Sequence, residues 1–235
     1  YTNNKKINDG TGENKPCMKI TFKGNFAGIV RKEFSITPGD LENTTLTLND
    51  VTYQNQAGKC KPSVVIKDTN GKTLNSGTDY RKLAFSDITY VRDTTVERIV
   101  NKKRVKVICE EGTAVNAADI VPAGTELMVT VTGIGNYDGT RISGYYRVTK
   151  SQISSAKIKV LKKQIYNKNE LCPGKPDLKV TVGNKTLTED DYEIVAYSNN
   201  VNKGKAKITI RGIGNYGGVK TLSFDIGSYN LSTVE

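Results

Sequence analysis

Apolar and polar residues alternate along most of this chain, and glycine-rich turns separate the alternating runs. The clearest example is Lys-Ile-Thr-Ile-Arg at residues 207–211, which leads into Gly-Ile-Gly-Asn-Tyr-Gly-Gly at residues 212–218. A second alternating run follows and ends in Phe224 and Ile226. A period of two places one side of each run in a core and the other in water, and glycine and asparagine let the chain reverse between runs. The pattern predicts a strand, a tight turn and a second strand.

The same pattern occurs at two other places, with turns at residues 133–139 and, in a shorter form, at residues 23–28. One aromatic residue stands in each turn: Phe26, Tyr137 and Tyr216. We expect each ring to cover the end of a core, and the alternative is an exposed ring that stacks on a sugar. The middle copy has one extra residue near Gly144, which predicts a β-bulge.

The offsets between these residues and the next apolar positions match in all three copies, which is the signature of a tandem array. Upstream residues also match, because residues 191–200 resemble residues 79–86. We therefore expect four parts: the C-terminal half of a repeat at residues 1–36, complete repeats at 37–149 and 150–226, and the first strand or linker of a following repeat at 227–235. The fold class expected is all-β, with one β-sandwich in each complete repeat.

The middle repeat carries an insertion near residues 87–124. Fifty-two positions separate Phe85 from Tyr137, whereas 19 separate the matching Tyr197 from Tyr216. Three strand-like runs (residues 88–91, 96–100 and 104–109) precede a predicted helical turn at residues 116–120, which Pro122 would end. The insertion contains the candidate binding residues for an anion or a glycan: Arg92, Arg98, Lys102, Lys103, Arg104 and Lys106.

The whole chain is basic, with 35 Lys and Arg against 24 Asp and Glu among 235 residues and a net charge of +11. Such a field attracts acidic glycans and cell-wall polymers in a salt-dependent manner. The alternative is that lysine covers strand faces and protects sheet edges. No nucleic-acid-binding module is recognisable. No apolar run approaches the roughly 18 residues that a membrane helix needs.

The residue types exclude several kinds of chemistry. The chain has no histidine, so a Ser-His-Asp or Cys-His pair is impossible, and a zinc site would need all four cysteines from distant segments. Adjacent acidic residues on a strand point to opposite faces and do not form a facing pair. We expect no enzyme activity, no cofactor and no metal. The cysteines (Cys17, Cys60, Cys109 and Cys172) are expected to be buried free thiols, with a bridge between Cys60 and Cys109 as the alternative.

Residues 175–226 carry a resemblance to a known family, and the rest of the chain shares it more loosely. The motifs are Lys-Thr-Leu at 185–187, Asp-Tyr-Glu-Ile-Val-Ala-Tyr-Ser-Asn-Asn at 191–200 and Lys-Gly-Lys-Ala-Lys-Ile-Thr-Ile-Arg-Gly-Ile-Gly-Asn-Tyr-Gly-Gly at 203–218. They resemble the tandem immunoglobulin-like repeats of secreted or cell-wall-bound surface proteins in Gram-positive gut bacteria.

The resemblance implies immunoglobulin-like β-sandwiches in an extracellular or cell-surface setting, with a non-enzymatic role as stalk, spacer or adhesive module. Host or cell-wall glycans and other surface proteins are the candidate partners. An alternative function is binding of a glycan or an anionic polymer through the basic insertion. The half-repeat at residues 1–36 leaves open a self-association in which the terminal strand of one molecule completes another.

Overall fold

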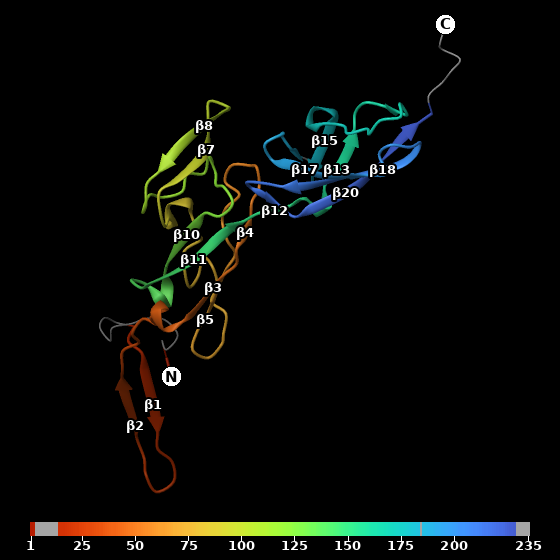
Figure 1. The fold of residues 1–235 in the computed structure, drawn as a ribbon. Coiled ribbons are helices and arrows are strands. Elements are labelled where there is room, and N and C mark those ends of the chain that lie inside the picture. Colours follow the sequence, from red (N-terminus) through yellow and green to blue (C-terminus); the bar gives the residue numbers. More distant parts are fainter. Residues whose placement is uncertain (3–13, 184, 229–235) are drawn as a thin grey trace.

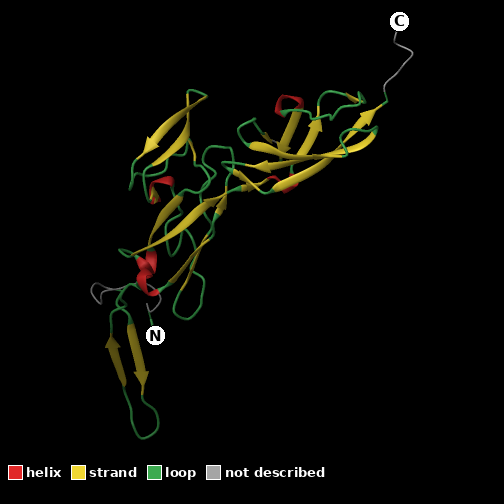
Figure 2. Cartoon of the chain, in the orientation of Figure 1, coloured by secondary structure: helices red, strands yellow, loops and turns green. Residues whose placement is uncertain are grey.

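The computed structural model describes residues 1–2, 14–183 and 185–228 and is built almost entirely of strands. Figures 1 and 2 show these strands in several separate sheets. The only helical elements of the described residues are five short 3-10 helices. The predicted all-β class is confirmed. Most of the predicted terminal strand or linker (residues 227–235), with the self-association built on it, lies outside the described residues.

The first element is a hairpin of strands β1 (Cys17–Thr21) and β2 (Ile29–Glu33), which pair antiparallel. In Figure 1 it forms one end of the molecule, without a facing sheet in the described part of the chain. Phe26 in its turn is 74% exposed. The prediction that this ring covers a core is therefore wrong, because the hairpin buries no second layer of side chains beneath the ring.

The middle segment (residues 37–149) contains a four-stranded sheet in the order β4-β11-β10-β6 and a two-stranded sheet of β3 and β5. The strands are β3 (Thr45–Leu48), β4 (Val51–Thr52), β5 (Val64–Lys67), β6 (Ile88–Tyr90), β10 (Glu126–Thr132) and β11 (Arg141–Thr149). Burial alternates along β10, where Leu127, Val129 and Val131 are buried. This alternation is the one the sequence predicts for a strand with one face on the core.

The C-terminal segment (residues 150–226) has the same kinds of sheet, in the orders β14-β20-β18-β17, β13-β15-β16 and β12-β19. Its strands are β12 (Ser151–Gln152), β13 (Lys157–Val160), β14 (Gln164–Ile165), β15 (Leu178–Val182), β16 (Lys185–Thr186), β17 (Tyr192–Ser198), β18 (Gly204–Gly212), β19 (Tyr216–Gly217) and β20 (Val219–Gly227). Ile208 and Ile210 of β18 are fully buried, and Phe224 of β20, opposite Ala206 of β18, is also buried. The core of this segment is therefore shared by its longest strands.

Matching residues of the two segments make matching backbone hydrogen bonds. In each glycine turn, the N–H of the isoleucine that follows the first glycine donates to an aspartate carbonyl. After the smaller hairpin of each segment, a leucine N–H donates to a carbonyl of the preceding strand. The pairs are Ile134 to Asp79 (2.9 Å) and Ile213 to Asp191 (3.0 Å), then Leu74 to Ile66 (2.9 Å) and Leu187 to Val180 (2.9 Å). Strands β4 and β14 also both pair in parallel with the last strand of their segment.

The first residue of the glycine turn in each of these two segments has to be glycine, because backbone atoms of the same turn occupy the place of a Cβ. A Cβ on Gly212 would lie 2.8 Å from the backbone nitrogen of Gly217, and a Cβ on Gly133 would overlap the carbonyl oxygen of Tyr137. This tight closure leaves Tyr216 only 3% exposed, as predicted, whereas Tyr137 is partly buried. Its ring packs on the backbone of Gly39.

The predicted bulge near Gly144 is wrong. Strands β10 and β11 pair without interruption from Glu126 with Arg147 to Thr132 with Arg141. The extra residue lies in the turn instead, since the N–H of Gly133 reaches the carbonyl of Thr140 while that of Gly212 reaches Gly218. A longer turn absorbs the residue without reversing the faces of a buried strand, which a shift of register would do.

The insertion forms a hairpin of β7 (Thr94–Val100) and β8 (Lys103–Cys109), and β9 (Asp119–Ile120) pairs with the other edge of β7. The predicted strand-like runs are confirmed. The predicted helical turn at residues 116–120 is wrong, because Ile120 is extended opposite Glu97. The side chain of Asn116 instead accepts from the N–H of Ala118 and makes a tight turn ahead of the strand.

We predict that Gly212→Ala destabilises the C-terminal segment by roughly 1–3 kcal/mol, because the new methyl group would lie within 3 Å of backbone atoms. Urea unfolding of the full chain measures the change. Gly174→Ala is the control, since Gly174 has a φ of −75° and a Cβ there would meet only Pro176, at 3.6 Å. Equal stability of the two variants would contradict the prediction.

Candidate functional site

A buried carboxylate fixes the inserted hairpin to the middle segment. Asp119 is fully buried and accepts four hydrogen bonds. Arg98 donates two of them, from Nε at 2.5 Å and from Nη2 at 3.2 Å. The hydroxyl of Tyr90 donates at 3.0 Å and the N–H of Asn116 at 2.9 Å. A buried charge is tolerated when it is paired and hydrogen-bonded in this way.

The surroundings of Asp119 shift the pKa values of its neighbours. The hydrogen bond to Asp119 raises the pKa of Arg98, so the guanidinium keeps its charge. Burial, with the nearby Asp119 charge, raises the pKa of Tyr90 far above its usual range. Burial likewise raises the pKa of the Cys60 thiol to about 11, and Asp119 adds to this shift. Cys60 is therefore a neutral thiol at pH 7 and a poor nucleophile.

All four cysteines are free thiols in the structure, and Cys60 and Cys109 are buried. The alternative bridge between these two residues is not formed. Cys109 instead lies beside Arg98, with 3.5 Å between Nη2 and Sγ. The prediction of buried thiols fails for Cys172, which is exposed, and for Cys17, which is half-buried.

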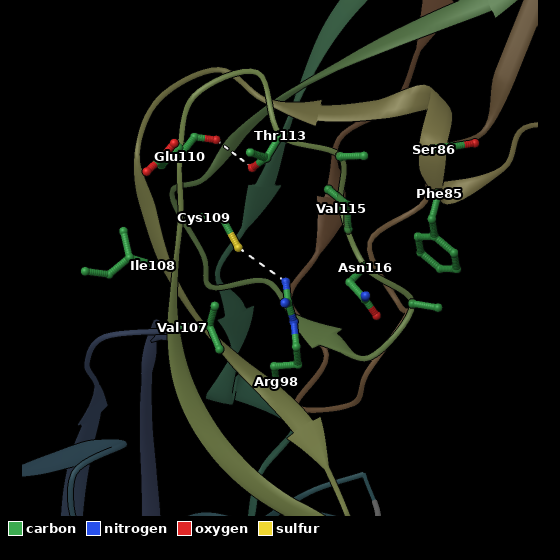
Figure 3. Close-up of a pocket in the computed structure, with 12 residues that line it drawn as sticks. Phe85, Ser86, Arg98, Val107, Ile108, Cys109, Glu110, Thr113, Val115 and Asn116 are labelled. Carbon is green, nitrogen blue, oxygen red and sulfur yellow. Dashed lines mark hydrogen bonds between the residues drawn. The ribbon is translucent and has the colours of Figure 1, made fainter.

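A cavity of about 640 Å³ lies beside Arg98, between the β7–β8 hairpin and residues 113–117. Figure 3 shows the guanidinium of Arg98 reaching toward Cys109, with Phe85 on the opposite wall. Ile108 points away from Cys109, toward the outside of the hairpin. Arg98 lines this cavity, but two of its nitrogens already donate to Asp119, which leaves fewer donors for a ligand.

The six predicted basic residues do not act as one patch. Arg98 is used on Asp119, Arg104 pairs with Glu97 at 2.6 Å, and Arg92 pairs with Glu126 at 3.3 Å. The three lysines are exposed and form no ion pair with any described residue: Lys102, Lys103 and Lys106. Lys102 lies at the hairpin tip with a φ of 64°. Of the six predicted residues, only the lysines have no acidic partner among the described residues.

A second feature lies where the middle and C-terminal segments meet. The side-chain oxygen of Asn215 accepts from the N–H of Ala123 at 2.8 Å, and its backbone oxygen accepts from the N–H of Ser151 at 3.0 Å. The ring of Tyr53 packs edge-on against that of Tyr216, with centroids 5.7 Å apart. Burial raises the pKa of Tyr53 to about 12, as expected for a ring enclosed at this contact.

Sequence reasoning missed Asp119, Tyr90 and Asn215. The signal for Asp119 was its position beside an apolar run, Ile-Val at residues 120–121, where a carboxylate needs a partner. The signal for Asn215 was its place in the glycine turn. The sequence indicated only that asparagine lets the chain reverse direction there. Neither signal identifies the partner, because Arg98 and Ala123 are distant in sequence.

We predict that Asp119→Ala lowers the free energy of unfolding by about 3–5 kcal/mol, because it leaves Arg98 as a partly buried charge without its partner. Chemical unfolding measures this loss, and amide exchange should show the β7–β8 hairpin loosening first. The control is Glu97→Ala, which removes an exposed ion pair with Arg104 and should cost about 0–1 kcal/mol. Similar losses in both variants would mean that Asp119 does not anchor the hairpin.

The described residues contain no cluster of three or more side chains suited to hold a metal ion. They also contain no helix that is long and apolar enough to cross a membrane. Comparison with known proteins adds no assignment: no family model, no curated protein and no solved structure matches this chain. The contacts described above are therefore the basis on which a function has to be argued.

Proposed function

We propose that this chain is a non-enzymatic, modular segment of a secreted or cell-surface bacterial protein, made of tandem immunoglobulin-like β-sandwiches that act as a stalk or spacer. The observation that carries the proposal is the same hydrogen bond before both complete segments. The carbonyl of Asn136 accepts from the N–H of Gly39 at 2.7 Å, and the carbonyl of Asn215 accepts from the N–H of Ser151 at 3.0 Å. In each case the glycine turn holds the strand-like stretch that enters its segment.

This contact suits a stalk because it limits how the entering chain can swing. Gly39 and Ser151 each stand two residues before a fully buried apolar residue, Leu41 and Ile153. The chain is thus held at the turn and again in the core within three residues. Figure 1 shows the hairpin, the middle segment and the C-terminal segment following one another along the molecule. Domains joined only by loose linkers would move independently.

The boundary between the middle and C-terminal segments has further contacts besides the hydrogen bond from Ser151 to Asn215. Asn215 bonds to Ala123 of the middle segment, and Tyr53 packs on Tyr216 across the boundary. These contacts join residues of the two segments directly. They support a fixed angle between the segments, as a spacer needs. An adhesive role is compatible with this arrangement, because a stiff rod presents whatever it carries at a set distance.

We predict that Asn215→Ala loosens this joint without unfolding either segment, because it removes the bond to Ala123 and keeps the turn glycines. Residual dipolar couplings measured on the full wild-type chain should fit one alignment tensor for both segments. In the variant, the two segments should need alignment tensors of different magnitude. Asn202→Ala, at an exposed loop position, is the control. If the alignment tensors of both segments were identical in all three proteins, the Asn215 bond would not fix the angle between the segments.

A second function is favoured by the three lysines of the inserted hairpin. Lys102, Lys103 and Lys106 are exposed and unpaired among the described residues, on an element that the C-terminal segment lacks. Three free charges on one hairpin can bind an acidic glycan of the host or the cell wall, or another anionic polymer, with an affinity that falls as salt rises. Other surface proteins with acidic faces would be attracted in the same way.

We predict that changing Lys102, Lys103 and Lys106 to Gln weakens retention on a sulfated polysaccharide column, so that the variant elutes at lower salt. The reason is the loss of three exposed charges that form no ion pair with a described residue. The control changes three exposed lysines of the C-terminal segment to Gln: Lys157, Lys159 and Lys179. If both triple variants elute together, the net charge of the chain is responsible and the hairpin is not a binding site.

A further inference from the structure

The outer edge of β8 is a long strand edge without a partner. In the sheet order β8-β7-β9, β8 is terminal, and it is seven residues long. No described strand pairs with its outer side, and Figure 1 shows the hairpin projecting beside the middle segment. Every second residue of such an edge presents a backbone N–H and C=O that can bind another strand.

Three of the other terminal strands have a register shift or a short length, which are features that hinder strand addition. Strand β17 is terminal in its sheet and has a register shift between Ile194 and Ala196. Strands β6 and β16 are terminal and only three and two residues long. Strand β8, in contrast, pairs with β7 over seven consecutive residues without a shift. It lacks the bulge or the shortness that blunts an edge.

The side chains of β8 are unusual for a protected edge. Ile108 is 71% exposed and Val105 is 40% exposed. Lysines often protect edges, and Lys103 and Lys106 could serve that purpose alone. Protection does not explain an exposed isoleucine at the rim of a cavity of about 640 Å³, however. Figure 3 shows this side chain extending away from Cys109. A residue of an added strand opposite Ile108 would pack beside it on the same face of the sheet.

We propose that the outer edge of β8 binds an extended acidic peptide segment by strand addition. The added strand places acidic residues opposite Lys103 and Lys106 and an apolar residue opposite Ile108. Strands rise by about 3.3 Å per residue, so the two acidic positions lie roughly 10 Å apart along the segment. Backbone hydrogen bonds supply affinity, and the side chains supply selectivity.

Charge along the edge sets the order of residues in this segment. The hairpin end of β8 carries the free lysines, whereas Glu110 and Glu111 follow its other end. Acidic residues are therefore favoured near the hairpin tip and disfavoured near Ile108. A second copy of this chain is a poorer occupant, because two β8 strands would bring lysines together. The inference does not depend on the stalk function, and it differs from glycan binding because a glycan leaves the edge amides unpaired.

The experiment uses the full chain labelled with ¹⁵N and a capped threonine peptide of about nine residues. Glutamates in the peptide face Lys103 and Lys106 and a valine faces Ile108, and the peptide is made in both chain directions. We expect one direction to bind and to slow amide exchange of alternate residues in β8 by at least about tenfold, as new backbone hydrogen bonds form. A peptide with lysine in place of glutamate should not bind.

Two variants separate strand addition from general attraction. Ile108→Asp places a charge where the valine would pack and should raise the Kd of the peptide at least about tenfold. Val219→Asp is the matched control, since Val219 is an exposed strand residue of the C-terminal segment, 51% exposed, and this change should leave the Kd unaltered. Both substitutions are at exposed sites, so the fold is kept.

Several results would overturn the proposal. The first is peptide binding that protects no amide of β8, and the second is equal weakening by Ile108→Asp and Val219→Asp. A third is a sulfated polysaccharide that shifts the lysine signals while no peptide binds, which would leave the glycan function intact. A fourth is protection of β8 that requires high protein concentration without peptide, which would identify a second copy as the occupant.

Discussion

The close approach of two backbone segments at the glycine turns is the constraint on which the architecture depends. At Gly212 there is no room for a Cβ, because Gly217 and Tyr216 cross within 3 Å of that position. In the same turn, the ring of Tyr216 is buried against Tyr53 and the Asn215 carbonyl accepts from Ser151. A glycine thus determines both the packing inside a segment and the direction from which the chain enters it.

The inserted hairpin depends on a different kind of interaction. Burying the Asp119 carboxylate carries a large desolvation cost, and four hydrogen bonds, two of them from Arg98, offset it. Such a contact adds little net stability but is costly to break, so it specifies one position for the hairpin. The position of the β8 edge and of its lysines is therefore set by a buried charge and not by a flexible loop.

The sequence predicted the all-β class and the strands of the insertion, because alternation with a period of two reports directly which face is buried. It could not predict that Phe26 is exposed, since the same motif covers a core at Tyr216 and the difference lies in a facing sheet. From the sequence, Arg98 was grouped with the exposed basic residues, although its guanidinium pairs with the buried Asp119. The role of an arginine depends on a partner 21 residues away, and a count of charges contains no such information.

The number of basic residues in the insertion differs from the number that lack an acidic partner in the structure. Arginine forms bidentate pairs with carboxylates, and the three arginines of the insertion all have acidic partners, whereas its three lysines have none among the described residues. Within the insertion, the basic residues without an acidic partner therefore lie at the hairpin tip and along β8. Because the outer edge of β8 also has unpaired backbone groups and an exposed isoleucine, its chemistry matches an extended polypeptide more fully than a polymer that offers charge alone.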